Sequence, residues 1–143
     1  MSEPNPFRFC HRLRVRWGEC DMQGIVFNPH YMAYVDAALT EYWRAVGLPY
    51  PQAFAQLGTD TFMVAANQTY ADAARFDDEL DVWLRTEYLG NTSLRLAFAI
   101  HREAHRLFHG TATYVNGDRI TRKPVRLGDL LRKRIGDYEA PET

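Results

Sequence analysis

Residues 15–43, VRWGECDMQGIVFNPHYMAYVDAALTEYW, join a strand-like segment to a long apolar helix through a short turn. The turn contains an acid, Asp21, and a glycine, Gly24. The pair Asn28-Pro29 is typical of a helix start, because Asn caps helices and Pro suits the first helical position. Acyl-transfer chemistry can use a carboxylate in this place. The carboxylate attacks a carbonyl carbon or activates water, while free N–H groups at the helix start polarise the carbonyl.

The helix that follows is predicted over residues 29–46, with Gly47 in its stop signal. It is apolar over most of its circumference, and its polar residues Asp36, Thr40 and Arg44 share one narrow stripe. Such a helix is usually covered by other structure, and a sheet curling round it would do this. We expect Asp36 to be structural, with Thr40 or Arg44 as its partner.

Strands are predicted on both sides of this helix, from alternating apolar and polar residues. The order is a strand, the long helix, a short second helix that ends at Gly58, a run of antiparallel strands and a terminal helix, which is an α+β layout. The predicted strands cover residues 7–16, 61–70, 80–87, 94–101 and 106–116, and the two shorter helices cover residues 51–57 and 127–135. We expect one domain over residues 1–143, with residues 1–6 disordered and residues 136–143 forming a tail.

Composition excludes several classes of function. The net charge of -1 argues against general nucleic-acid binding, which usually needs a basic domain. No apolar run approaches the roughly 20 residues of a membrane span, and the segment MSEPNPFRF lacks the apolar core of a signal peptide. Cys10 and Cys20 have neither metal-like spacing nor the number needed for a disulfide framework, so we expect a reduced, cytoplasmic setting.

This layout and the Asp21 segment together resemble the hot-dog-fold acyl-CoA thioesterases, and among them the 4-hydroxybenzoyl-CoA thioesterase type. The resemblance covers nearly the whole chain. The matching motifs are Val15-Arg16-Trp17, Glu19-Cys20-Asp21, Gly24-Ile25-Val26-Phe27, Pro29-His30-Tyr31, Asp36-Ala37-Ala38 and Gly90-Asn91-Thr92-Ser93.

The resemblance implies a five-stranded antiparallel sheet wrapped round the helix, a homodimer with one continuous sheet, and often a homotetramer. It also implies an active site at the dimer interface. Asp21 matches the catalytic acid, which acts as nucleophile or as general base for water. The backbone N–H groups of Phe27 and Asn28 would polarise the thioester carbonyl. Because Asn28 stands where many relatives of the broader branch have His, a His-assisted variant is not expected.

Further residues are candidates for binding the substrate. Trp17, Gly24, His30 and Tyr31 are expected to line the pocket, with aromatic surface from the large side chains and close ligand approach at the glycine. Glu19 is expected to be exposed to solvent, because it alternates with the catalytic candidate along the turn.

Residues 119–134 contain seven basic residues and one acid. The three phosphate groups of coenzyme A need Arg or Lys nearby, although a charge run is also often just a solvated surface. Candidate CoA-binding residues are Asn91, Thr92, Ser93, Arg122, Lys123 and Arg126.

The sequence thus predicts hydrolysis of acyl-CoA to a carboxylic acid and free CoA, without a metal or redox cofactor. His101, His105 and His109 share no ligand spacing, and Cys20 has no cue for activation. Two alternatives stay open: a hot-dog dehydratase acting on 3-hydroxyacyl thioesters, and a non-catalytic acyl-thioester-binding protein.

Overall fold

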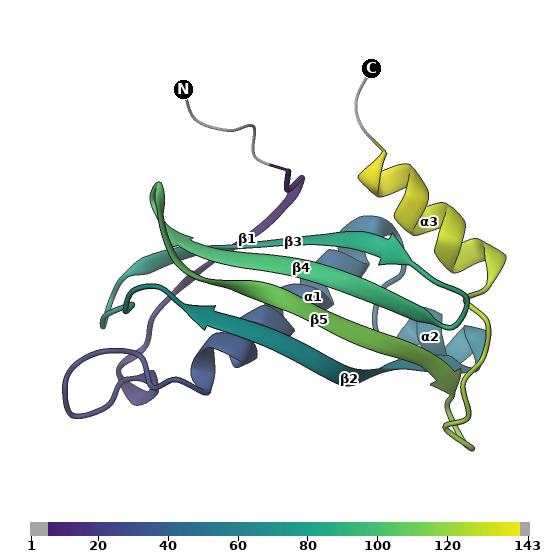
Figure 1. The fold of residues 1–143 in the computed structure, drawn as a ribbon, viewed down its shortest axis with the longest axis horizontal. Coiled ribbons are helices and arrows are strands. Elements are labelled where there is room, and N and C mark those ends of the chain that lie inside the picture. Colours follow the sequence, from purple (N-terminus) through teal and green to yellow (C-terminus); the bar gives the residue numbers. More distant parts are fainter. Residues whose placement is uncertain (1–5, 141–143) are drawn as a thin grey trace.

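The structure, a computed structural model, describes residues 6–140, and these form a five-stranded antiparallel sheet with a long helix on one face (Figure 1). The order of the strands in the sheet is β1-β3-β4-β5-β2. The elements are β1 (Phe9–Arg14), a 3-10 turn η1 (Trp17–Glu19), α1 (His30–Val46), α2 (Gln52–Leu57), β2 (Thr59–Tyr70), β3 (Glu79–Leu89), β4 (Ser93–Arg102), β5 (His105–Asp118) and α3 (Asp129–Glu139). The predicted α+β layout is confirmed. Disorder was expected for residues 1–6, of which residues 1–5 lie outside the described residues.

Helix α1 packs behind the sheet, where it contacts β1 and β3 (Figure 1). Its buried side chains face the inner side of the sheet, which is lined by aliphatic residues of β3 and β4. Helix α1 ends at Gly47, whose φ of 97° is strained for a residue with a side chain. The predicted Asn28 cap is wrong, because the helix begins one residue later, Pro29 is its N-cap and no side chain caps it.

Two other boundaries differ from the prediction. Strand β5 continues through Asn116 and Gly117 and ends at Asp118, because its long pairing with β2 outweighs the local turn signal of Asn-Gly. Helix α3 starts at Asp129 rather than at residue 127 and continues to Glu139, so residues 136–139 are helical and do not form a tail. The last turn of α3 contains no basic residue, and Arg132, Lys133 and Arg134 lie in its middle. No helix within residues 6–140 is long and apolar enough to cross a membrane.

Helix α3 docks on the sheet through a carboxylate at its C-terminal end. Glu139 Oε2 accepts a 2.6 Å hydrogen bond from the Tyr42 hydroxyl of α1 and a 2.8 Å bond from the Thr86 backbone N–H of β3. Strand β1 pairs with β3 only as far as Leu84, so Glu139 supplies the acceptor that the sheet does not offer to Thr86. Burial, and then the negative charge of Glu139, raise the pKa of Tyr42 well above its usual range.

We expect Glu139→Ala to destabilise the fold by about 1–3 kcal/mol, because it leaves the Thr86 backbone N–H without its acceptor and reduces the buried Tyr42 hydroxyl to its 2.8 Å bond with Thr86 Oγ1. Asp137→Ala on the same helix is the control, because Asp137 pairs only with Lys133 on the exposed surface and should change little. Urea unfolding of both variants measures the difference. Equal stability of the two variants would contradict this account of how α3 docks.

Candidate active site

The segment from Glu19 to Phe27 forms a narrow hairpin-like loop that presents Asp21. The Phe27 N–H donates to Glu19 O at 3.0 Å, Cys20 and Val26 form an isolated bridge, and the Asp21 N–H donates to Ile25 O at 2.9 Å. Gly24, with φ of 77°, makes the reversal that a residue with a side chain would resist. The loop therefore has a defined conformation.

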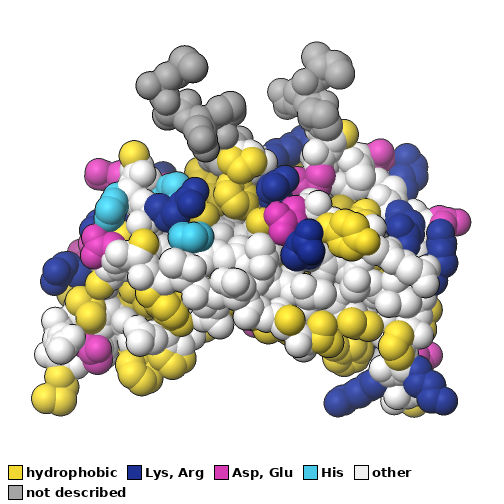
Figure 2. Space-filling model, viewed as in Figure 1, with side chains coloured by type: hydrophobic (Ala, Val, Ile, Leu, Met, Phe, Trp, Pro, Cys, Tyr) yellow, Lys and Arg dark blue, Asp and Glu magenta, His cyan; other side chains and the backbone are white. Residues whose placement is uncertain are grey.

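A second segment, residues 71–78, holds this loop from outside. The Val26 N–H donates to Ala74 O at 2.9 Å, and Ile25 bridges to Arg75. Trp17, which is exposed, packs edge-on against Phe76 with ring centroids 5.3 Å apart. In Figure 2 hydrophobic side chains gather at the lower left, the end of the molecule where Figure 1 places this loop. The exposed hydrophobic residues of this part are Trp17, Met22, Phe27, Tyr70 and Phe76.

One oxygen of the Asp21 carboxylate accepts a hydrogen bond from the loop, and the other accepts none within the described residues. Oδ1 accepts a 2.8 Å hydrogen bond from the Gln23 N–H, which fixes the side chain in an Asx-type turn. Oδ2 has no hydrogen-bond partner within residues 6–140, and the residue is partly exposed. A carboxylate oriented through one oxygen can use the other toward a ligand.

The two backbone groups proposed to polarise a carbonyl differ in the structure. The Phe27 N–H already donates to Glu19 O, so it is committed within the loop. The Asn28 N–H has no acceptor in the described part of the chain, and it stands directly before the helix. The Asn28 carbonyl accepts a 3.3 Å bond from the Tyr31 N–H and lies 3.5 Å from the Tyr70 hydroxyl of β2. Asn28 is therefore the free donor at this helix start.

The expectation that Glu19 is exposed is wrong. Its side chain is only 17% exposed, and Oε1 accepts 2.8 Å hydrogen bonds from the Tyr34 hydroxyl and from the Arg16 N–H. Burial opposes ionisation, but the bonds from Arg16 and Tyr34 and the charge of the Arg16 side chain outweigh it, so the pKa of Glu19 lies below its usual value.

Two of the residues expected in the pocket lie elsewhere. Tyr31 is a core residue, 2% exposed, with its ring stacked on Phe108 and its hydroxyl accepting the Ala74 N–H at 3.0 Å. His30 lines a different cavity, of about 320 Å³, between β1 and α1, where Glu19 and Tyr34 also lie. The alternation of apolar residues along α1 does not reveal which aromatic side chains face the sheet and which face a ligand.

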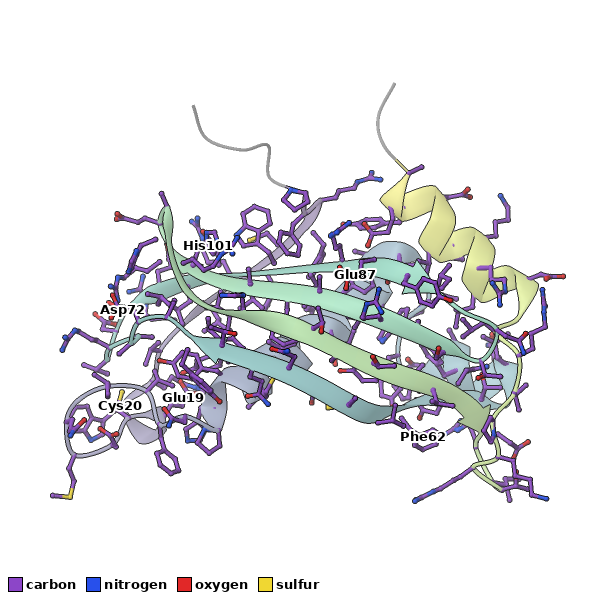
Figure 3. The ribbon with its side chains drawn as sticks, in the orientation of Figure 1. Glu19, Cys20, Phe62, Asp72, Glu87 and His101 are labelled. Atoms are coloured by element: carbon purple, nitrogen blue, oxygen red, sulfur yellow. The ribbon has the colours of Figure 1, made fainter. Side chains whose placement is uncertain are left out.

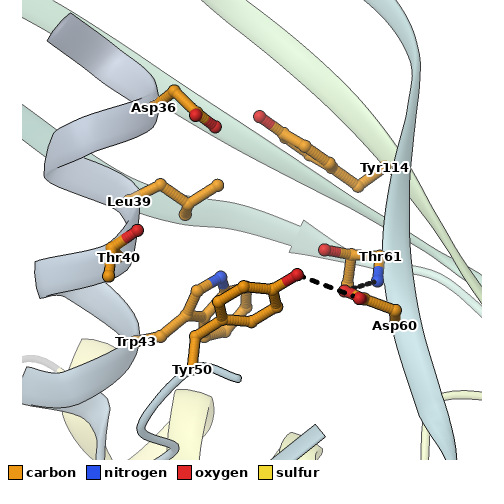
Figure 4. Close-up of a pocket in the computed structure, with 8 residues that line it drawn as sticks. All are labelled: Asp36, Leu39, Thr40, Trp43, Tyr50, Asp60, Thr61 and Tyr114. Carbon is orange, nitrogen blue, oxygen red and sulfur yellow. Dashed lines mark hydrogen bonds between the residues drawn. The ribbon is translucent and has the colours of Figure 1, made fainter. Parts of the chain in front are cut away.

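A further cavity, of about 180 Å³, lies between the C-terminal half of α1 and the strands β2 and β5. Figure 4 shows Asp36 and Tyr114 pointing toward one another across it, and Tyr50 donating a 3.0 Å hydrogen bond to Asp60. Tyr114 is 6% exposed, and its hydroxyl has no hydrogen-bond partner among the described residues. Burial, and then the charge of Asp36, raise the pKa of Tyr114 to about 12.

The predicted structural pairing of Asp36 with Arg44 is wrong, because Arg44 pairs with Glu41 one turn away. Asp36 is exposed and has no hydrogen bond within the described residues. Sequence reasoning missed Tyr50, Asp60 and Tyr114 as lining residues. They come from a loop and two strands that approach α1 only in the folded chain, and no spacing in the sequence marks them.

The residues expected to bind CoA gather at the opposite end of the sheet from Asp21. The Leu127 N–H donates to Asn91 O and the Asn116 N–H to Thr92 O, so the turn before β4 and the loop after β5 lie side by side. Figure 3 labels Glu19 and Cys20 at one end of the molecule and Phe62 near the other. Strand β4 has 10 residues and separates the two ends by about 30 Å, at roughly 3.3 Å per residue.

The basic residues of this end divide into two groups. Arg132 donates to the carbonyls of Leu127, Gly90 and Asn91, so it holds the two loops together. Arg122 stacks its guanidinium 5.8 Å above the Phe62 ring on β2, while Arg126 pairs loosely with Asp129, and both stay exposed with Lys123. The second group can meet an anionic ligand. Within residues 6–140 no three His, Cys, Asp or Glu side chains stand in a metal-binding arrangement.

Comparison with known proteins points to one family. A family model described as the thioesterase superfamily matches residues 23–109, starting two residues after Asp21. A protein of Aquifex aeolicus (strain VF5) that carries an esterase name is 30% identical over 95 residues, covering 66% of this chain and 73% of its own. The 4-hydroxybenzoyl-CoA thioesterase of Pseudomonas sp. (strain CBS-3) is 32% identical over 89 residues, covering 57% of this chain and 63% of its own.

Solved structures share the fold. A thioesterase from Thermus thermophilus, in complex with coenzyme A and Zn, superposes with a TM-score of 0.82 at 22% identity, covering 98% of this chain and 100% of its own. The sheet, the central helix and their connections are therefore those of a hot-dog fold.

Proposed function

Because the chain belongs to the thioesterase superfamily, we propose that it hydrolyses the thioester bond of acyl-coenzyme A, with Asp21 as the acid that carries the reaction. The observation behind this proposal is the presence of two unbonded groups in the segment that leads into α1. Asp21 offers an unbonded carboxylate oxygen, and Asn28 offers an unbonded N–H within the described chain. A carboxylate and an oxyanion donor are the two groups that hydrolysis of a thioester needs.

Two routes use these groups. In the first, Asp21 Oδ2 attacks the thioester carbon, the C–S bond breaks to release the CoA thiolate, and water splits the resulting mixed anhydride. In the second, Asp21 takes a proton from a water molecule that attacks the same carbon, and the C–S bond then breaks to release the acid and the CoA thiolate. In both routes the Asn28 N–H stabilises the negative charge on the carbonyl oxygen. The relative from Pseudomonas, named for 4-hydroxybenzoyl-CoA, supports an acyl-CoA as substrate.

We further propose that a complete site needs two copies of the chain. Strand β2 pairs with β5 on one side only, and its residues from Met63 to Tyr70 are exposed. An exposed edge of this length favours pairing with another strand. Two copies of β2 joined antiparallel about a two-fold axis continue the sheet and place the Tyr70 end of one strand beside the Thr59 end of the other.

This pairing brings together the separated parts of the candidate site. The Tyr70 hydroxyl lies against Asn28, so that end of β2 carries the Asp21 loop. The Arg119 N–H donates to Gly58 O, and Arg122 stacks on Phe62, so the other end carries the loop of residues 119–126, here called the basic loop. In the dimer, Asp21 of one protomer faces the basic loop of its partner. A homotetramer and a cytoplasmic location stay predictions from the sequence.

The cavity beside α1 is proposed to receive the acyl group, because Asp60 and Thr61 place it at the same end of β2 as the basic loop. Its volume of about 180 Å³ compares with the ~150 Å³ cavity that holds one benzene molecule in another protein. Release of free thiol from a panel of acyl-CoAs tests the function directly. Thiol release excludes a non-catalytic binding protein and a dehydratase, since neither cleaves the thioester.

Asp21→Asn keeps the shape of the side chain and removes the attacking or proton-accepting charge. We expect turnover to fall by at least ~10²-fold, the lower end for loss of a general base, with the fold and substrate binding retained. Steady-state thiol release measures it, with circular dichroism as the check on folding. Near-native turnover would exclude Asp21. During a single turnover in ¹⁸O-labelled water, label in the Asp21 carboxylate selects the nucleophilic route.

The basic loop is expected to contribute binding rather than chemistry. Arg122→Gln, Lys123→Gln and Arg126→Gln combined should raise KM by at least ~10-fold, since one charge-assisted hydrogen bond is worth about 1.5–3 kcal/mol, and leave kcat little changed. Lys133→Gln is the control, because Lys133 pairs with Asp137 on the exposed side of α3. A KM unchanged at low and high salt would show that the loop is only a solvated surface.

Mixing two defective variants tests the shared site. One protein carries Asp21→Asn and the other carries the three changes in the basic loop, and the two are unfolded and refolded together. In a random mixture half of the dimers are mixed, and each has one site with both halves intact, so about a quarter of the native kcat/KM should return. Activity no higher than the sum of the separate variants, or a stable, fully active monomer in light scattering, would contradict the two-copy site.

A further inference from the structure

Glu19 is a partly buried acid two residues before Asp21, and the proposed chemistry does not use it. Its side chain contacts α1 through the hydrogen bond from Tyr34, and it contacts the end of β1's connecting segment through Arg16. Its two oxygens are both engaged, since Oε1 accepts two hydrogen bonds and Oε2 lies 3.4 Å from the Arg16 guanidinium. A carboxylate with its acceptors occupied in this way is poorly placed to attack or deprotonate a ligand.

The backbone of the same residue forms the base of the Asp21 loop. Glu19 O accepts the Phe27 N–H at 3.0 Å, and this is the pair that closes the loop immediately before Asn28. The Glu19 N–H in turn donates to Arg16 O at 3.0 Å within η1. One residue therefore ties together η1, both arms of the loop and the first turns of α1.

Tyr34 makes this connection rigid. Its side chain is buried, and it belongs to the part of α1 that packs on the sheet, so its hydroxyl is a fixed point. Burial, and then the hydrogen bond to Glu19, raise the pKa of Tyr34 far above its usual range. The hydrogen bond from Tyr34 thereby fixes the position of the Asp21 loop relative to α1, the helix that follows Asn28.

We propose that Glu19 is a positioning residue, which holds the Asp21 carboxylate at the correct place relative to the Asn28 N–H through its bond with Tyr34. This inference rests on the proposed thioesterase function. Misplacement of a catalytic group by about 1 Å can cost ~10²-fold in rate. The loop is short and bonded at its base. Loss of the Glu19 side chain therefore shifts the Asp21 carboxylate relative to the Asn28 N–H without removing either group.

Four single variants separate positioning from other roles. Glu19→Ala removes the side-chain bonds, and Tyr34→Phe removes only the donor. Glu19→Gln keeps an oxygen that accepts from both Tyr34 and Arg16, because the Arg16 side chain is exposed and can move away from the new amide. Tyr42→Phe is the matched control, since it also removes a carboxylate-bonded hydroxyl from α1, but at the far end of the helix.

We expect Glu19→Ala to lower kcat by ~10–100-fold and Tyr34→Phe by ~10-fold, with KM nearly unchanged, because the proposed acyl cavity and CoA-binding residues include neither side chain. Glu19→Gln should recover most of the native kcat. Tyr42→Phe should lower the midpoint of urea unfolding and leave kcat unchanged. The double variant Glu19→Ala/Tyr34→Phe should lose no more than Glu19→Ala alone, because both changes break one interaction.

Each other result overturns the inference. A Glu19→Gln protein as slow as Glu19→Ala would show that the charge acts in the reaction. Native kcat in Glu19→Ala, measured where urea unfolding shows it folded, would show that Glu19 serves stability alone, and losses that add in the double variant would separate it from Tyr34. Asp21→Asn is assayed beside them. If that variant turns over normally, the proposed function fails, whereas an inactive Asp21→Asn with a fully active Glu19→Ala rejects only this inference.

Discussion

The packing of α1 against one face of the sheet is the constraint on which the rest of the structure depends. Burial of its aromatic and aliphatic side chains fixes the helix along the strands. The start of the helix then lies at the end of the molecule that carries the Asp21 loop, and its C-terminal half lies over the cavity beside β2. The hydrophobic contact between α1 and the sheet therefore positions both the Asn28 N–H before the helix and the wall that α1 forms for the cavity.

Two buried tyrosines anchor this helix to neighbouring segments in the same way. Tyr34 donates to Glu19 near the start of α1, and Tyr42 donates to Glu139 of α3 two turns later. A buried hydroxyl needs a partner, and a carboxylate is a strong acceptor. Each bond therefore adds a polar contact between the buried helix and a neighbouring segment of the chain. The first bond is the one proposed to orient the Asp21 loop, and the second supplies an acceptor to β3 beyond the end of its pairing with β1.

The free edge of β2 accounts for the division of the candidate site. Antiparallel connections send the Asp21 loop to one end of the sheet and the loops after β5 and before β4 to the other. No movement within a single sheet brings these ends together. In the proposed dimer a second copy paired along β2 joins them, and Asn28 and Phe62, which contact the two ends of that strand, belong to the two proposed halves of the site. In this proposal, pairing along β2 both covers the exposed sheet edge and brings the two halves of the site together.

The sequence by itself determined the order of elements, the long apolar helix, and the acid and glycine of the turn before it, because these depend on local periodicity and local backbone preference. It placed Asp21 at a helix start and placed Gly47 and Gly58 as helix ends. Only the tertiary structure decided which groups are free. The Phe27 N–H is consumed by Glu19, Tyr31 is buried in the core, and Tyr114 and Asp60 meet Asp36 across a cavity. Hydrogen-bond partners and cavity walls come from residues far apart in the chain, so no local pattern encodes them.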